Sequence, residues 1–405
     1  MSIEMRNMRI AVALGLLCAL AAPGVTAPVP KTAKMDAETI AAYERLGGVY
    51  GALQTIGDGS LEFRAFKVDD PREGTPAFRF GEFPRGPLPR SNIPFGLDLS
   101  GVQLIPEDLL ELKEIPNLTA LNLANFTDDL SSGLKEIKGL AALDLSVSEV
   151  TGAGLGDFQN LTTLILYKTN VTDAGLKEIK KLKKLAMLNL SYTDITDAGL
   201  EDFEEFKQLA TLNLARTAVT DKGLIQLKKL RALAELNLGS TEVTDSGLKD
   251  LGELKQLATL NLNYTRVTDE GLKVFKGLKT ITALYLNNTK VTDSGLKELG
   301  ELKDLATLDL YRTGITDSGV GDLKKFKRLS TLDLAYTGVS DAGLKDLKDC
   351  KDLSSLNLQG TKVSDRGIEE LQQLSKLTYI DISFTEVTQA GRKRLKTALP
   401  NCIID

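Results

Sequence analysis

The sequence predicts an α/β solenoid in which every repeat contributes one short parallel strand and one short helix. Three observations lead to this fold class. One phrase recurs at a fixed spacing along most of the chain, its apolar residues change from a period of two to a period near three, and about 70 of the 405 residues are Leu. A regular repeat explains the Leu excess better than two or three separate globular domains do.

The repeat has a spacing of 24 residues. The phrase Leu188-Asn-Leu190-Ser-Tyr-Thr-Asp-Ile-Thr-Asp-Ala-Gly-Leu200 returns, with conservative changes, from Leu212 to Leu224. The second Leu of each L-x-L marks ten units in strict register: Leu166, Leu190, Leu214, Leu238, Leu262, Leu286, Leu310, Leu334, Leu358 and Ile382. Leu99, Leu123 and Leu145 mark three looser units upstream, so about 13 units cover residues 97–405.

Each part of the unit has a physical reason. In L-x-L both Leu side chains point inward from a strand, and the residue between them faces outward. The apolar residues Leu200, Phe203, Phe206 and Leu209 recur every three residues, which predicts a short helix with one buried face.

The turn between strand and helix is polar. Thr196 or Asp197 can cap the helix start, and Gly199 allows close backbone approach. Thr193, just after the strand, is expected to point inward and to bond backbone groups of the neighbouring coil. Ten such Thr, from Thr169 to Thr385, would then form an internal ladder.

The phrase L-x-x-L-x-L-x-x-T-x-(I/V)-T-D-x-G-L resembles the leucine-rich repeat, in its bacterial, planctomycete-like T-D-x-G-L subclass. The resemblance covers about three quarters of the chain. It implies a right-handed coil curved into an arc, with parallel strands on the concave face and short helices on the convex face. Thr replaces the Asn common in other leucine-rich repeats, so no plant or animal receptor role is carried over.

Both ends of the solenoid need a cap, because an unmated repeat exposes its Leu face. At the C-terminus Gln389 and Arg392 replace Asp and Leu, and we expect a polar cap there. Cys350 is expected to be a small buried side chain, and a Cys350–Cys402 disulfide is not expected.

Residues 1–27 are predicted to be a secretory signal peptide. Arg6 and Arg9 precede the apolar run Ile10 to Ala22, and small residues follow up to Ala27. A retained membrane anchor is the alternative, and a lipoprotein signal at Cys18 is a weaker one. The export signal places the mature chain outside the cytoplasm, as a secreted, periplasmic or cell-surface protein without a membrane span.

Residues 28–96 do not repeat, and we expect them to form an N-terminal cap region. A helix is predicted at residues 35–46 and a strand at 61–68, followed by a Pro- and Gly-rich stretch without a period. A small separate functional domain and a flexible spacer are the alternatives.

Composition excludes several kinds of chemistry. The chain has no His, which removes Ser-His-Asp triads, Cys-His pairs and His-based zinc sites. Its formal net charge of −5 disfavours nucleic acid as a ligand. No phosphate-binding loop, nucleophile motif or cofactor motif is present. The recurring Asp, from Asp173 to Asp365, invites a calcium interpretation, but a position at each helix start explains it better. We therefore expect no metal, no cofactor and no catalytic site.

The outward strand positions carry the functional hypothesis. The residues between the two Leu form a polar, increasingly acidic stripe: Asn189, Asn213, Asn237, Asn261, Tyr285, Asp309, Asp333, Asn357 and Asp381. Tyr and Arg, the side chains enriched where proteins bind tightly, recur beside it. The predicted partner-binding residues are Tyr167, Tyr192, Arg216, Tyr264, Tyr285, Tyr311, Arg312 and Tyr336.

We therefore expect an exported, non-enzymatic module that binds a protein or peptide partner on its concave face. A surface glycan-binding protein is the first alternative, because Tyr and Asn also suit carbohydrate. An enzyme with its activity in residues 28–96 is a weaker one, and a purely structural envelope role is also compatible with the sequence.

Overall fold

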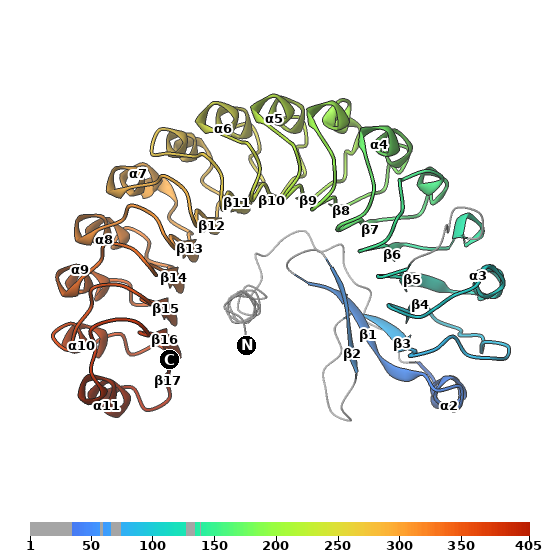
Figure 1. The fold of residues 1–405 in the computed structure, drawn as a ribbon, viewed down its shortest axis with the longest axis horizontal. Coiled ribbons are helices and arrows are strands. Elements are labelled where there is room, and N and C mark those ends of the chain that lie inside the picture. Colours follow the sequence, from blue (N-terminus) through green and yellow to red (C-terminus); the bar gives the residue numbers. More distant parts are fainter. Residues whose placement is uncertain (1–34, 57–59, 66–73, 127–133, 138) are drawn as a thin grey trace. The chain divides into compact units, whose positions relative to one another are not determined.

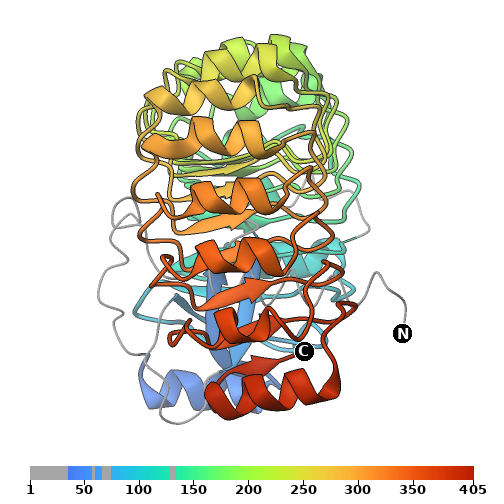
Figure 2. The ribbon, with the colours of Figure 1, turned by 90° about the vertical axis from the view of Figure 1, so that its left-hand side faces the viewer.

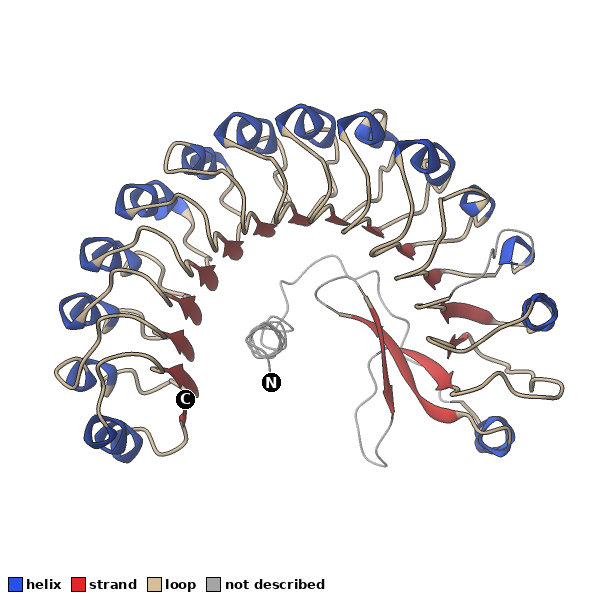
Figure 3. Cartoon of the chain, in the orientation of Figure 1, coloured by secondary structure: helices blue, strands red, loops and turns tan. Residues whose placement is uncertain are grey.

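The computed structural model describes residues 35–56, 60–65, 74–126, 134–137 and 139–405. The expected signal peptide, residues 1–27, lies outside them. The chain divides into two compact units, Met1–Asn213 and Leu214–Asp405, called unit 1 and unit 2 below. In each unit short strands alternate with short helices, so the α/β solenoid predicted from the repeat is confirmed (Figure 1, Figure 3).

Unit 1 contains the N-terminal strands and the first coils. Its elements, with η for 3-10 helices, are α2 (Ala37–Arg45), β1 (Val49–Thr55), β2 (Leu61–Ala65), β3 (Thr75–Arg79), β4 (Phe95–Asp98), α3 (Pro106–Lys113), β5 (Leu118–Asn122), η1 (Leu134–Glu136), β6 (Ala142–Asp144), η2 (Leu155–Asp157), β7 (Thr163–Ile165), α4 (Asp173–Ile179), β8 (Met187–Asn189), η3 (Asp197–Leu200), η4 (Phe203–Glu205) and β9 (Thr211–Asn213).

Unit 2 contains the regular coils and the C-terminal end. Its elements are α5 (Asp221–Leu227), β10 (Glu235–Asn237), α6 (Asp245–Leu251), β11 (Thr259–Asn261), η5 (Gly271–Gly277), β12 (Ala283–Tyr285), α7 (Asp293–Glu298), η6 (Leu299–Glu301), β13 (Thr307–Asp309), α8 (Asp317–Leu323), β14 (Thr331–Asp333), α9 (Asp341–Leu347), β15 (Ser355–Asn357), α10 (Ile368–Leu371), β16 (Tyr379–Asp381), α11 (Gln389–Ala398) and β17 (Ile403–Ile404).

The strands of unit 2 form one parallel ladder in sequence order. Leu260 of β11 pairs with Leu284 of β12, and Leu284 with Leu308 of β13. Within this unit the strands lie on one side of the coils and the helices on the other, where the orange-to-red helices stack side by side (Figure 2). We call the surface of the strands that points away from the helices the strand face.

Leu side chains fill the space between the strands and the helices. Leu188 and Leu190 of one coil have no exposed surface, and neither do Leu200, Phe203 and Phe206 of the helical segment that follows. The same holds for nearly every equivalent residue, which confirms both predicted apolar patterns. Full burial of one Leu contributes about 1.5–3 kcal/mol, so the stack of Leu is the main source of stability.

The inward-pointing Thr ladder is confirmed, but its expected bonding is wrong. Thr169 to Thr361 are buried and Thr385 is half-buried. The Thr193 hydroxyl donates to the carbonyl of Leu190, 2.6 Å away in its own coil, not to the neighbouring coil. Each hydroxyl thus satisfies the carbonyl of the second Leu of L-x-L, which lies where the chain turns out of the strand.

The Asp of the T-D-x-G-L phrase joins consecutive coils. Asp245 accepts from the backbone N–H of Thr268 at 2.8 Å and from its hydroxyl at 2.7 Å. In the regular helices the equivalent Thr also caps the helix, as Thr244 does for α6 by accepting the Ser246 N–H, so the cap there is the Thr and not the Asp. The same bridge recurs at Asp173–Thr196, Asp221–Thr244, Asp269–Thr292, Asp293–Thr316, Asp317–Ser340, Asp341–Ser364 and Asp365–Thr388.

The Gly of the phrase makes room for this bridge. A Cβ at Gly247 would lie 2.5 Å from Oδ1 of Asp221 in the preceding coil and 2.9 Å from its Cα. The second distance involves backbone, which cannot move aside without shifting the coil. The close approach expected at this Gly is therefore to the Asp of the coil before it.

The N-terminal region contains both elements predicted for it. The helix expected at residues 35–46 is α2, and the strand expected at 61–68 is β2, with residues 66–68 outside the described ranges. Strand β1 pairs antiparallel with β2 and with β3, and β3 pairs in parallel with β4, the strand of the first coil. The pairing of β3 with β4 places this region against the first coil.

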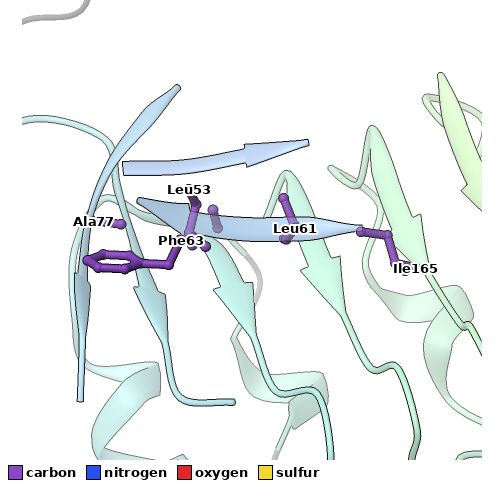
Figure 4. Packing of buried hydrophobic residues seen from close by; sticks show 6 residues of the cluster. Leu53, Leu61, Phe63, Ala77 and Ile165 are labelled. Carbon is purple, nitrogen blue, oxygen red and sulfur yellow. The ribbon is translucent and has the colours of Figure 1, made fainter. Parts of the chain in front are cut away.

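The same region also covers part of the strand face of unit 1, which the sequence did not predict. Leu53, Leu61 and Phe63 of β1 and β2 pack with Ala77, Ala120 and Ile165 in one buried cluster (Figure 4). Ile165 stands between two Leu, where most coils have Asn or Asp. An apolar residue is favourable at this position because an apolar segment covers it.

The C-terminal end is closed by α11 and β17. Thr388 caps α11 by accepting from the N–H of Gly391, and Arg392 donates to the carbonyl of Ile382 at 3.0 Å. Cys350 and Cys402 are both buried free thiols, as expected.

Replacing Asp245 by Ala should lower the free energy of unfolding by about 1–3 kcal/mol, because the N–H and hydroxyl of Thr268 lose their acceptor. Denaturant titration followed by circular dichroism measures this. Asp304→Ala is the control, since Asp304 makes one exposed ion pair with Arg328 on the helix side and should cost less than about 1 kcal/mol. Equal losses in the two variants would contradict the bridging role of Asp245.

Candidate docking surface

Three kinds of position make up the strand face of a coil. The inner position is the residue between the two Leu of L-x-L, such as Asp309 between Leu308 and Leu310. The other two positions are the residues that follow the second Leu, Tyr311 and Arg312 in that coil. We call the second of these, occupied by Arg312, the turn position.

The inner positions are not free of structural duty, contrary to the prediction from sequence. Asn189, Asp333 and Asp381 are buried, with at most 5% of their surface exposed. Their side-chain oxygens accept the backbone N–H two residues later, for example Ser191 on Asn189 at 2.9 Å and Ala335 on Asp333 at 2.8 Å. The polar stripe therefore exists, and it holds the turn that follows each strand.

The turn positions share a left-handed backbone. In unit 2, φ is 57° at Tyr264, 51° at Arg312, 54° at Tyr336 and 55° at Phe384. Bulky side chains rarely occupy this region, whereas Asn and Gly do so at little cost. Other coils place Ser240, Asn288 and Gly360 there, so the fold does not itself require an aromatic residue.

The aromatic residues at these positions are exposed. Tyr264 exposes 56% of its surface, Tyr336 39% and Phe384 73%. Arg216, another predicted binding residue, is also exposed, with φ of 54°.

Tyr311, Arg312 and Tyr336 form one cluster in unit 2. The two rings meet edge to face with their centroids 5.4 Å apart, and the Arg312 guanidinium lies 5.2 Å from each centroid. Gly360 in the next coil gives Tyr336 its place, since a Cβ there would lie 2.7 Å from the Tyr336 ring. Tyr285, in the inner position of β12, is half-buried.

The predicted residues of unit 1 lie near the N-terminal strands. Tyr167 is half-buried and packs against the cluster around Leu61 and Ile165. Its ring meets the exposed Tyr192 edge to face at 5.0 Å. Tyr167 is thus partly used for internal packing, which the sequence pattern could not reveal.

Asp309 and Asp333 stand opposite each other on neighbouring strands. Burial raises the pKa of Asp309 to about 6, and burial together with the charge of Asp309 raises the pKa of Asp333 to about 8. Each also accepts hydrogen bonds that favour its ionised form, from the Tyr311 N–H at 3.0 Å and from Asn357 at 2.8 Å. Being adjacent, the two carboxyl groups titrate as a pair and hold a proton near neutral pH.

The helix side shows a different chemistry. Exposed ion pairs of both signs link neighbouring coils there, such as Arg231 with Glu253 and Lys376 with Asp352. The helix side is therefore a solvated exterior. The aromatic cluster of unit 2 lies on the strand face instead.

Metal-binding clusters and membrane-spanning helices are both absent from the described part of the chain. No group of three or more Cys, Asp or Glu side chains could hold a metal ion. No helix in those ranges is long and apolar enough to cross a membrane.

Sequence reasoning missed the left-handed backbone and the covering of part of unit 1. Gly360 was an available signal for the left-handed backbone, because a Gly at this position of one coil indicates a conformation that is unfavourable for the side chains of the other coils. Ile165 was a signal for the covering.

The buried Asp pair makes stability depend on pH. The native pair keeps a proton that unfolded carboxyl groups, with a pKa near 3.8, have released, so the free energy of unfolding should fall as pH rises from about 4 to about 8. The charged and titratable groups around the pair are Tyr285, Tyr311, Arg312, Tyr336, Tyr379 and Asp381. Asp309→Asn removes one charge and should recover about 2–3 kcal/mol at pH 8.5.

Denaturant titrations between pH 4.5 and 8.5 measure this effect. The matched control is Asp304→Asn, which makes the same charge change at an exposed position. Parallel pH curves for wild type and Asp309→Asn would show that the pair carries no extra proton.

Comparisons with known proteins agree with the repeat. A family model described as "Leucine Rich repeat" matches residues 182–203, 257–276 and 277–300. A search of curated proteins finds no match. Among solved structures, an internalin from Listeria monocytogenes is similar with a TM-score of 0.54 and 22% identity, covering 74% of this chain and 88% of the other.

A second similar structure is the mouse RP105/MD-1 complex, with a TM-score of 0.51 and 17% identity over 75% of this chain and 57% of the other. At such identities the likeness establishes the fold alone. The family model thus identifies leucine-rich repeats at residues 182–203 and 257–300, and the solved structures share the same repeat fold.

Proposed function

We propose that this chain is a non-enzymatic binding protein whose strand face in unit 2 docks a protein or peptide partner. Leucine-rich repeats are typical of protein–protein interaction modules. The observation that carries the proposal is the exposure of Tyr264, Arg312, Tyr336 and Phe384 at backbone positions that disfavour them.

The energetic argument is a comparison among equivalent coils. A left-handed backbone costs a bulky residue about 1 kcal/mol or more, and exposed rings recover little of this by burial. Ser240, Asn288 and Gly360 occupy the same position in other coils. In unit 1, Val147 and Lys168 also have this left-handed backbone. In unit 2, however, the bulky side chains at this position are Arg or aromatic, and such side chains dominate protein interfaces, which supports a role outside the fold.

The geometry favours a protein over a glycan. Sugars stack on the open faces of aromatic rings, but Tyr311 and Tyr336 meet edge to face and Arg312 lies over both. Arg and Tyr held together in this way offer both hydrogen-bond donors and contact area to a protein surface. In unit 1, by contrast, the N-terminal strands already cover part of the strand face.

The finer assignments rest on the sequence alone. We infer that the repeats belong to the T-D-x-G-L subclass, that residues 28–96 cap the solenoid, and that residues 1–27 direct export. The binding role does not depend on the final compartment.

Tyr264→Asn and Phe384→Asn should each raise the free energy of unfolding by about 0.5–1 kcal/mol while weakening capture of the native partner at least tenfold. Asn suits the left-handed position, as Asn288 shows, and it removes the exposed ring. Chemical unfolding measures the first effect, and a cross-linking pull-down from native cells followed by calorimetry with the captured partner measures the second.

The control is Lys290→Asn, an exposed residue at the edge of the strand face in the same unit. Stabilised variants that bind the partner as wild type does would place the binding surface elsewhere.

Export is tested on the full chain expressed in a bacterium. The extracytoplasmic fraction should contain a chain that begins near Pro28, as mass spectrometry of its N-terminus would establish. A cytoplasmic chain that keeps the apolar run Ile10 to Ala22 would overturn the export assignment.

A further inference from the structure

Resting on the proposed docking function, we propose that the strand face of unit 2 from β12 to β16 selects an extended peptide segment that carries Lys or Arg side chains. The proposal combines two observations. In unit 1 the inner positions bond the backbone of one extended strand and the Arg of another, and the later coils have acidic inner positions without a cation of their own.

The internal example is the pair of strands β2 and β3 in unit 1. The backbone N–H of Leu61 donates to Asp144 Oδ2 at 3.2 Å, and the Asn122 amide donates to the Leu61 carbonyl at 3.3 Å. Asp144 and Asn122 both occupy inner positions of their coils. Side chains at this position can therefore bond the backbone of an extended segment laid on the strand face.

The same example includes an Arg. Arg79 of β3 places its guanidinium on the inner-position carboxylate of Asp98, with both Nε and Nη2 at 2.6 Å from Oδ2. Asp98 is fully buried, so the cation compensates a carboxylate removed from water. Arg79 reaches Asp98 from the neighbouring strand of the sheet, whereas Asp144 and Asn122 bond the backbone of β2. The inner positions of the first coils thus bond both an extended backbone and a cation.

Unit 2 presents the same acceptors in its last coils. Asp309, Asp333 and Asp381 occupy inner positions there, and no Lys or Arg among the described residues lies within 4.0 Å of their carboxylates. Arg312 lies instead over the rings of Tyr311 and Tyr336. A carboxylate has about four acceptor sites. Asp309 is half-buried and Asp333 is 5% exposed, so a ligand reaches the unused sites of Asp309 first and meets the charge of Asp333 directly behind it.

Charge complementarity decides the chemistry of the occupant. The strand face from β12 to β16 contains three Asp and one Arg at its inner and turn positions, together with Tyr285, Tyr336 and Phe384, and Tyr311 lies between Asp309 and Arg312. The methylene stem of a Lys or Arg packs on such rings while its charged end reaches the carboxylates. An acidic segment would place like charges together on a poorly solvated surface.

The Asp pair also predicts how binding depends on pH. A bound cation favours the ionised pair, so binding releases the proton held near neutral pH, and affinity should rise between pH 5.5 and 8.5. The charged and titratable groups that surround the pair here are the same as above: Tyr285, Tyr311, Arg312, Tyr336, Tyr379 and Asp381.

The test uses a random dodecapeptide phage library panned on the full chain and on the double variant Asp309→Asn/Asp333→Asn. Asn occupies the inner position in other coils, so the double variant should fold. Peptides selected on wild type should be enriched in Lys and Arg and lack Pro. Labelled copies should lose at least tenfold in affinity on the double variant, as measured by fluorescence anisotropy at pH 8.

The matched control is Asp304→Asn/Asp352→Asn, which removes two carboxylates from the helix side of the same unit. It should leave the affinity unchanged. Equal losses in the two double variants, or selected peptides no more basic than those obtained on Asp309→Asn/Asp333→Asn, would overturn the proposal.

The docking function and the preference for basic segments can be tested separately. If Tyr264→Asn weakens capture of the native partner but the Asp double variant does not, the docking surface stands and its preference for basic segments is refuted. If neither change matters, both are refuted.

Discussion

Each coil of this protein depends on its neighbours, and the bridge from Asp to the next Thr is the interaction that fixes how they stack. Burial of Leu drives the coils together without direction. The Asp245 carboxylate, bound to both the N–H and the hydroxyl of Thr268, gives one coil a defined position on the next. The Gly that follows must lack a side chain for this bridge to form. The Thr, the Asp and the Gly of the repeat phrase therefore all serve the same contact between coils.

The elements that repeat could be predicted from the sequence, whereas the contacts between one coil and the next, and between the N-terminal region and the coils, could not. Strands, helices and the inward Thr follow from periodicity, which reports the inside and outside of one coil. The partner of each Asp lies 23 residues later, and local reasoning assigned it to the nearest helix end instead. Residues 28–96 have no period, so the packing of Leu61 on Ile165 could be found only in three dimensions.

The candidate site shows the same division. Tyr264 and Tyr336 were identified by residue type, but the reason to regard them as functional is their left-handed backbone, which sequence reasoning did not provide. The inner position was interpreted as free surface, whereas Asn189 and Asp333 hold the turns that present the next residues. Fold and site are therefore coupled, since the inner side chain fixes the turn and the turn directs the aromatic ring outward.

Regular repetition makes departures from it informative. A uniform stack would repeat one surface, and nothing would distinguish one segment of the strand face from another. Ile165 and Gly360 are departures at positions where neighbouring coils have other residues, and each matches a particular neighbour: Ile165 a covering strand and Gly360 the ring of Tyr336. The adjacent Asp309 and Asp333 depart from the Asn found in several preceding coils. Selection for stacking alone would favour Asn at the inner position and Gly or Asn at the turn position. Where the chain instead concentrates Asp, Tyr and Arg, the stack gives up some stability, and the proposed ligand would supply the compensating interaction.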